Sequence, residues 1–127
     1  MAPVREVQVT FDCADPERLT RFWCEVLGYV VPPEWDGPVC FCVDPNGVGP
    51  RLYFQKVPEG KAVKNRVHLD VRVGTGLVGA ERLAALEAEC ARLLPLGATR
   101  LYLLEADGKN ESCLVMQDPE GNEFCLD

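Results

Sequence analysis

The chain of 127 residues contains the same order of predicted elements twice, and this internal repeat restricts its fold more than any other feature. In each half, a strand-like segment precedes an amphipathic helix, and three shorter strand-like segments follow. The halves correspond at three places: Val7-Gln8-Val9 with Val67-His68-Leu69, Leu27-Gly28 with Leu96-Gly97, and Asp44-Pro45-Asn46-Gly47 with Asp118-Pro119-Glu120-Gly121. A repeat of this kind indicates two similar structural modules. We therefore predict an α+β fold made of two βαβββ modules.

The first half shows strand and helix periodicities in turn. Residues 4–13 alternate between apolar and polar side chains, which is typical of a strand with one apolar face. Asp15-Pro16-Glu17 then supplies a helix start and Gly28 a stop, and the helix between them carries one apolar stripe. Turn-forming residues separate the three segments that follow. These predicted strands cover residues 29–31, 39–43 and 51–55.

The second half repeats this order. Residues 66–73 alternate again, with His68 and Asp70 on the polar side of the predicted strand. A second helix is predicted over residues 79–94, and its apolar stripe contains Leu83, Leu86, Cys90 and Leu93. Three strands follow, near residues 99–105, 112–117 and 123–126. The segment between the halves contains Pro58, Gly60 and several charged residues, which favours a linker.

Length and composition favour one domain. A chain of 127 residues with 47% hydrophobic content can bury one core but is short for two ordinary domains. We expect a single domain over residues 1–127, with module one at about 1–57, a linker at about 58–64 and module two at about 65–127. Seven cysteines are present without a CxxC pair, and we expect most of them to be buried thiols rather than disulfides.

The charge of the chain restricts its partners. The net charge of -7 comes without acidic runs or basic stripes, which disfavours nucleic acid and anionic membranes as partners and leaves a small molecule as the expected ligand. No segment has the 18 or more consecutive apolar residues typical of a membrane span, and the first residues do not resemble a signal peptide. We therefore expect a cytoplasmic protein.

Several motifs together resemble the vicinal oxygen chelate superfamily, which contains glyoxalases, bleomycin resistance proteins and dioxygenases. They are Asp15-Pro16 before the Phe22-Trp23 helix, Leu27-Gly28, His68 in the strand that opens the second half, and Asp118-Pro119-Glu120-Gly121-Asn122. The string Phe54-Gln55-Lys56-Val57-Pro58-Glu59, followed by Lys64-Asn65-Arg66-Val67-His68-Leu69-Asp70, is similar to the uncharacterised glyoxalase-like domain subgroup. The resemblance implies sheets that curve around a central site with helices on the outer face, and a homodimer.

The resemblance also points to four positions where many members hold a metal. In this chain they are occupied by Gln8, Tyr53, His68 and Cys125. Glyoxalase-type members typically place glutamates in the last strand of each module, where this chain has Tyr53 and Cys125. Two missing carboxylates remove the negative charge that balances a divalent cation, and a phenol and a thiol are an uncommon ligand pair. We therefore predict no metal at this site and no other cofactor.

The candidate site residues lie on the polar faces of the predicted strands. His68 is the only histidine, and Asp70 shares its strand face, so these two are the catalytic candidates. The candidate ligand-binding residues are Gln8, Trp35, Tyr53, Gln55 and Cys125. The same polar pattern also arises on the solvated face of an edge strand, and Trp35 could instead close the edge of the core.

Three functional classes remain open. The first is a protein that binds a small molecule without the family metal centre, for sequestration, resistance or sensing. The second is a lyase, isomerase or dioxygenase of the same superfamily, either metal-dependent or using His68 as acid or base. The third is a dimerisation or scaffold domain. The replacement of both glutamates by Tyr53 and Cys125 favours the first class, because binding through hydrogen bonds and stacking does not need those carboxylates.

Overall fold

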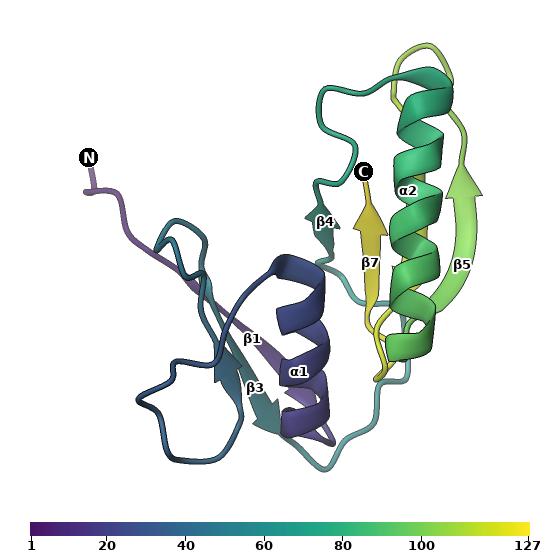
Figure 1. Cartoon of the computed structure of the whole chain (residues 1–127). Helices are drawn as coiled ribbons and strands as arrows, with labels where there is room; N and C mark the ends of the chain where they lie inside the picture. Colours follow the sequence, from purple (N-terminus) through teal and green to yellow (C-terminus); the bar gives the residue numbers. More distant parts are fainter. The chain divides into compact units, whose positions relative to one another are not determined.

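Each half of the chain forms its own sheet with one helix packed on it, so the predicted α+β fold of βαβββ modules is confirmed. The computed structural model describes residues 1–127 and divides into the units Met1–Gly60 and Lys61–Asp127. Figure 1 shows α1 beside β1 and β3 in the first unit, and α2 beside β7 and β5 in the second. No helix in the structure combines the length and the apolar character needed to cross a membrane.

The first unit contains a three-stranded sheet in the order β1-β3-β2. Its elements are β1 (Gln8–Cys13), α1 (Pro16–Leu27), β2 (Phe41–Cys42) and β3 (Arg51–Lys56). β1 and β3 are parallel, and β2 is antiparallel to β3. The strand predicted at residues 29–31 is wrong, since only a bridge from Val30 to Val43 forms there. Pro32 and Pro33 follow directly, and proline has no N–H group with which to continue a ladder.

Local sequence signals account for α1. The Asp15 carboxylate accepts a hydrogen bond from the Arg18 N–H at 3.2 Å, and Pro16 occupies the first helical turn. Gly28 ends the helix at a φ of 69°, a left-handed conformation that favours glycine. The predicted apolar stripe is buried at Leu19, Phe22, Trp23 and Val26. α1 therefore forms where the capping residues and the periodicity predict it.

The second unit contains a four-stranded sheet in the order β4-β7-β6-β5. Its elements are β4 (Leu69–Val71), α2 (Gly79–Leu93), a 3₁₀ turn (Leu94–Leu96), β5 (Thr99–Leu104), β6 (Cys113–Gln117) and β7 (Glu123–Leu126). β4 is parallel to β7, and β6 is antiparallel to both β7 and β5. The central strands β6 and β7 carry most of the buried apolar residues of this sheet, which places the core of the unit between them and α2.

The first strand of the second unit is shorter than the alternation over residues 66–73 predicts. β4 begins at Leu69, so His68 lies one residue before the strand, and the Val67 side chain is 79% exposed. The cause is Asn65, whose side chain bonds both backbone groups of Glu123 at the start of β7. This side-chain amide occupies the hydrogen-bonding groups that a longer β4 would need. The prediction of a strand through His68 is therefore wrong.

Candidate functional site

A pocket of about 650 Å³ lies in the second unit. It is lined by His68, Asp70 and Cys125 together with apolar groups that include Tyr102 and Leu104. Its volume falls within the roughly 300–1,000 Å³ that small-molecule sites usually occupy. Three of the residues predicted as site residues are therefore brought together in one cavity.

The sheet places these three residues in contact. Asp70 on β4 is the register partner of Cys125 on β7, and the His68 Nε2 atom lies 3.2 Å from the Asp70 Oδ1 atom. The side chains of His68 and Asp70 are 41% and 50% exposed, so both can reach a molecule in the pocket. His68 has a nitrogen that can donate or accept a proton, and Asp70 can orient it. The pair is therefore suited to hydrogen bonding with a ligand and to acid–base chemistry.

The Cys125 thiol is buried behind this pair. Burial, which is the largest cause, and the neighbouring Cys113 thiol and Asp70 carboxylate together raise the pKa of Cys125 to about 12. A thiolate is the nucleophilic form of cysteine, so the free side chain is protonated and unreactive near neutral pH. Cys125 therefore contributes a thiol to the pocket wall and is a poor nucleophile there.

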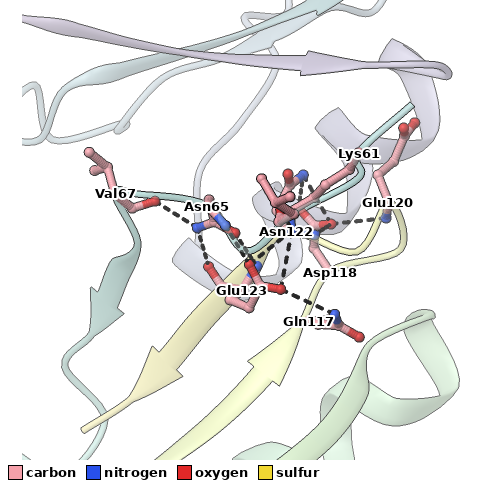
Figure 2. A network of polar contacts seen from close by, with 9 residues as sticks. Lys61, Asn65, Val67, Gln117, Asp118, Glu120, Asn122 and Glu123 are labelled. Atoms are coloured by element: carbon pink, nitrogen blue, oxygen red, sulfur yellow. Dashed lines mark hydrogen bonds and ion pairs between the residues drawn. The ribbon is translucent and has the colours of Figure 1, made fainter. Parts of the chain in front are cut away.

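A polar network holds the segment that leads into His68 (Figure 2). The Glu123 carboxylate, 10% exposed, accepts hydrogen bonds from the Asn65 backbone N–H, Lys61 Nζ and Gln117 Nε2 at 3.0, 3.2 and 3.3 Å. Burial alone would raise the pKa of Glu123, but the hydrogen bonds from Asn65, Lys61 and Gln117 outweigh it and lower the pKa from 4.5 to about 2. We name the residues Lys61, Asn65, Gln117 and Glu123 the Glu123 clamp. The clamp ties the chain before His68 to the strand that carries Cys125.

The turn before β7 is fixed by Asp118, also visible in Figure 2. One of its carboxylate oxygens accepts hydrogen bonds from the backbone N–H groups of Glu120 and Asn122, each at 2.9 Å. Asp44 plays the same part in the first unit, where its carboxylate accepts from the N–H groups of Asn46 and Gly49 at 2.7 and 2.8 Å. Such turns hold the start of the following strand in place. In the second unit this strand begins with Glu123, the central residue of the clamp.

Arg82 on α2 also lines the pocket, although no motif in the sequence marks it as a site residue. Its guanidinium is buried and donates two hydrogen bonds to the Ser112 carbonyl, at 3.1 and 2.8 Å, and one to the Gly74 carbonyl, at 3.0 Å. The buried face of α2 begins at Arg82, whereas the predicted stripe began at Leu83. The spacing of residues 82, 86, 90 and 93 fits one face of a helix, but an arginine is rarely buried at such a position.

The other predicted residues belong to the first unit. Tyr53 and Gln55 on β3 are register partners of Thr10 and Asp12 on β1, while Gln8 donates a hydrogen bond to Thr10 at 3.3 Å. Gln8 and Gln55 are exposed and Tyr53 is half-buried, so these strands do present a polar face. The assignment of Gln8, Tyr53 and Gln55 to ligand binding stays a prediction.

Trp35 lies in the loop before β2. Its indole N–H donates a hydrogen bond to the Pro38 carbonyl at 2.8 Å, and its ring lies edge-on to Phe41 with the centroids 5.2 Å apart. The side chain remains 43% exposed. These contacts fit the alternative in which Trp35 closes the edge of the core, and its role in stacking on a ligand stays a prediction.

The donors in the pocket do not fit the oxygen-rich metal centre that the family resemblance implies. The ligand atoms of His68, Asp70 and Cys125 lie within 4.8 Å of one another, but they supply one nitrogen, one carboxylate and one sulfur. Hard cations such as Mn²⁺ and Mg²⁺ prefer oxygen ligands. The nearby Glu123 carboxylate is already held by three donors of the clamp. We therefore derive no chemistry from such a centre.

Comparison with known proteins agrees with this fold. A family model described as "Glyoxalase-like domain" matches residues 8–126, and the chain belongs to this family. A search of curated protein sequences found no match.

Solved structures show the same fold at low sequence identity. One is a glyoxalase/bleomycin resistance protein/dioxygenase family enzyme from Burkholderia phytofirmans PsJN, with 18% identity, a TM-score of 0.70 and 94% of each chain covered. The fosfomycin resistance protein FosX from Mesorhizobium loti has 16% identity and a TM-score of 0.64, with 98% of this chain and 92% of that chain covered. A FosX mutant from Listeria monocytogenes, solved with Mn(II) and 1S,2S-dihydroxypropylphosphonic acid, has 11% identity and a TM-score of 0.71, with 99% and 90% covered.

Proposed function

We propose that this protein binds a small organic molecule in the pocket of the second unit, without an oxygen-rich metal centre. The observation that carries the proposal is the exposed pair of His68 and Asp70 inside a cavity of about 650 Å³. Such a pair offers both a donor and an acceptor, while Tyr102, Leu104 and Val115 add apolar lining. A molecule with polar groups at one end and an apolar body would match this lining. Sequestration, resistance and sensing are all roles that such binding could serve.

A binding experiment tests the proposal. Chelator-treated protein is screened against a small-molecule library by thermal shift, and hits are measured by titration calorimetry. We expect His68→Ala and Asp70→Asn each to weaken binding about tenfold, which is the effect of losing one hydrogen bond of about 1.4 kcal/mol. The control is Glu81→Gln, which removes one carboxylate charge from an exposed position of α2 outside the pocket. Hits that bind only when Mn²⁺ is added, or that bind both pocket variants as tightly as the control, would contradict the proposal.

A second candidate function is catalysis by His68 as acid or base, favoured by the 3.2 Å contact with Asp70. In that case the wild-type protein converts a bound compound, and His68→Ala binds it without conversion. Mass spectrometry of the hit after prolonged incubation distinguishes the two functions. Recovery of unchanged compound from the wild-type protein would argue for binding alone. The homodimer that the resemblance implies stays a prediction.

A further inference from the structure

The strand residues that line the pocket share one face of the sheet in the second unit. They occupy alternate positions along the strands and include Asp70 on β4, Cys125 on β7, Cys113 and Val115 on β6, and Tyr102 and Leu104 on β5. The positions between them, such as Leu114, Phe124 and Leu126, are fully buried on the side where α2 packs. The floor of the pocket therefore extends across the whole width of the sheet.

A row of register partners crosses this floor from one edge of the sheet to the other. Asp70 on β4 is the partner of Cys125 on β7, and Cys125 is also the partner of Val115 on β6. Val115 in turn is the partner of Tyr102 on the edge strand β5. Neighbouring strands lie about 4.8 Å apart, so the three steps from β4 to β5 span about 14 Å. A molecule that contacts both ends of the row needs about this length.

The chemistry changes along this row. At the β4 end, Asp70 and the neighbouring His68 present exposed hydrogen-bonding groups. In the middle, Cys125 and Val115 are buried and supply a protonated thiol and an isopropyl group. At the β5 end, Tyr102 is 48% exposed, so its ring offers area that a ligand can cover. Aromatic rings pair with such a ring more favourably than their buried area alone accounts for. The β5 end therefore favours an aromatic group.

We propose that the organic ligand of this pocket is an elongated molecule about 14 Å long that lies across the sheet. Its hydrogen-bonding head contacts His68 and Asp70, its middle is apolar, and its far end is an aromatic ring stacked on Tyr102. This inference rests on the proposed function and adds the length of the ligand and the position of its ring. Tyr102 is then a specificity-determining residue, because a compound of only a few carbon atoms cannot contact both ends.

A series of phenylalkanols from benzyl alcohol to 6-phenylhexanol tests this length. The hydroxyl group can donate to Asp70 and accept from His68, while each added methylene carries the phenyl ring further away. Binding to the full-length protein is measured by titration followed by two-dimensional amide NMR spectra, which detect weak complexes. We expect the affinity to rise about threefold to fourfold with each methylene, which is the effect of burying one CH₂ group.

Variants at the two ends of the row separate short from long probes. Benzyl alcohol can contact only one end, so it should respond either to His68→Ala or to Tyr102→Ala. The longer 6-phenylhexanol should be weakened by both, about tenfold by the loss of a hydrogen bond and about fivefold by the loss of stacking. Tyr102→Phe should keep the wild-type affinity, and Tyr102→Leu should not. Because Tyr102 is half-exposed, these changes should preserve the fold.

The matched control is Leu101→Ala, which removes a large apolar side chain from the adjacent position of β5 outside the pocket lining. It should leave the affinity for 6-phenylhexanol unchanged. Absence of binding by every probe, or a loss in Leu101→Ala as large as in Tyr102→Ala, would overturn the inference. A flat series that His68→Ala still weakens would overturn it while the proposed function stands. A rising series that neither His68→Ala nor Asp70→Asn weakens would overturn both.

Discussion

Replacing Glu123 with alanine should lower the free energy of unfolding by about 3 kcal/mol at pH 7, since hydrogen bonds to a charged group contribute about 1.5–3 kcal/mol each and part of the Lys61 contact is exposed to solvent. The carboxylate is 10% exposed and accepts from Asn65, Lys61 and Gln117. Its removal leaves the Asn65 N–H and the Lys61 ammonium without this acceptor. Urea unfolding followed by circular dichroism measures the loss. Glu111→Ala, which removes an exposed carboxylate of the same unit, should change stability by less than about 0.5 kcal/mol.

The lowered pKa of Glu123 predicts that its contribution to the free energy of unfolding depends on pH. The pKa of Glu123 is about 2 in the folded protein against 4.5 without these contacts, so the folded state favours the charged form. The contribution of this carboxylate is therefore fully present above about pH 4.5 and is lost as the pH falls toward about 2. The difference in stability between the wild type and Glu123→Ala should shrink over that interval. A difference that stays constant from pH 5 to pH 2 would show that the clamp does not depend on the charge.

Replacing Arg82 with methionine should cost about 2–3 kcal/mol, because one buried carbonyl loses both of its donors, at about 1–3 kcal/mol, and a second keeps only its hydrogen bond from the Leu77 N–H. Those carbonyls belong to Ser112 and Gly74, and Arg82 as a whole is only 7% exposed. Methionine has a similar length and keeps the apolar contacts of the side-chain stem. Thermal and urea unfolding measure the effect. Arg82→Lys should recover only part of the loss, since one ammonium group does not reproduce the planar fork that spans both carbonyls.

The matched control for Arg82 lies on the same helix. Arg92→Met removes a guanidinium that is paired with Glu89, from a side chain that is 44% exposed, so it should cost less than about 1 kcal/mol. If Arg82→Met costs no more than Arg92→Met, or if lysine replaces Arg82 without loss, the hydrogen bonds to Gly74 and Ser112 do not stabilise the fold as proposed.

Local signals in the sequence predicted the helices well. Asp15, Pro16 and Gly28 act on neighbouring backbone groups, and α1 begins and ends where they predict. The spacing of His68 and Asp70 predicted that they share one side of the chain, and the structure places them in contact. Their role in ligand binding or catalysis remains a prediction, as do the module boundaries.

Contacts between distant residues account for what the sequence did not predict. The early part of the predicted strand over residues 66–73 is replaced by bonds between Asn65 and Glu123, which are 58 positions apart. Arg82 is buried because the carbonyls of residues 74 and 112 accept its hydrogen bonds. The sequence pattern of the helix gives no indication of these acceptors. Similarly, Cys113 joins the site only through the pairing of β6 with β7. Such partners can be identified only once the pairing of the strands is known.

The turns at Asp44 and Asp118 are held by hydrogen bonds from backbone N–H groups, so they do not depend on the side chains of the strands that follow. Both turns use a carboxylate to hold backbone N–H groups, and both precede the last strand of their unit. The first residue of that strand differs completely, since Arg51 opens β3 where Glu123 opens β7. The side chains on the last strand of either unit can therefore be substituted to bind a new ligand without changing the turn that precedes the strand.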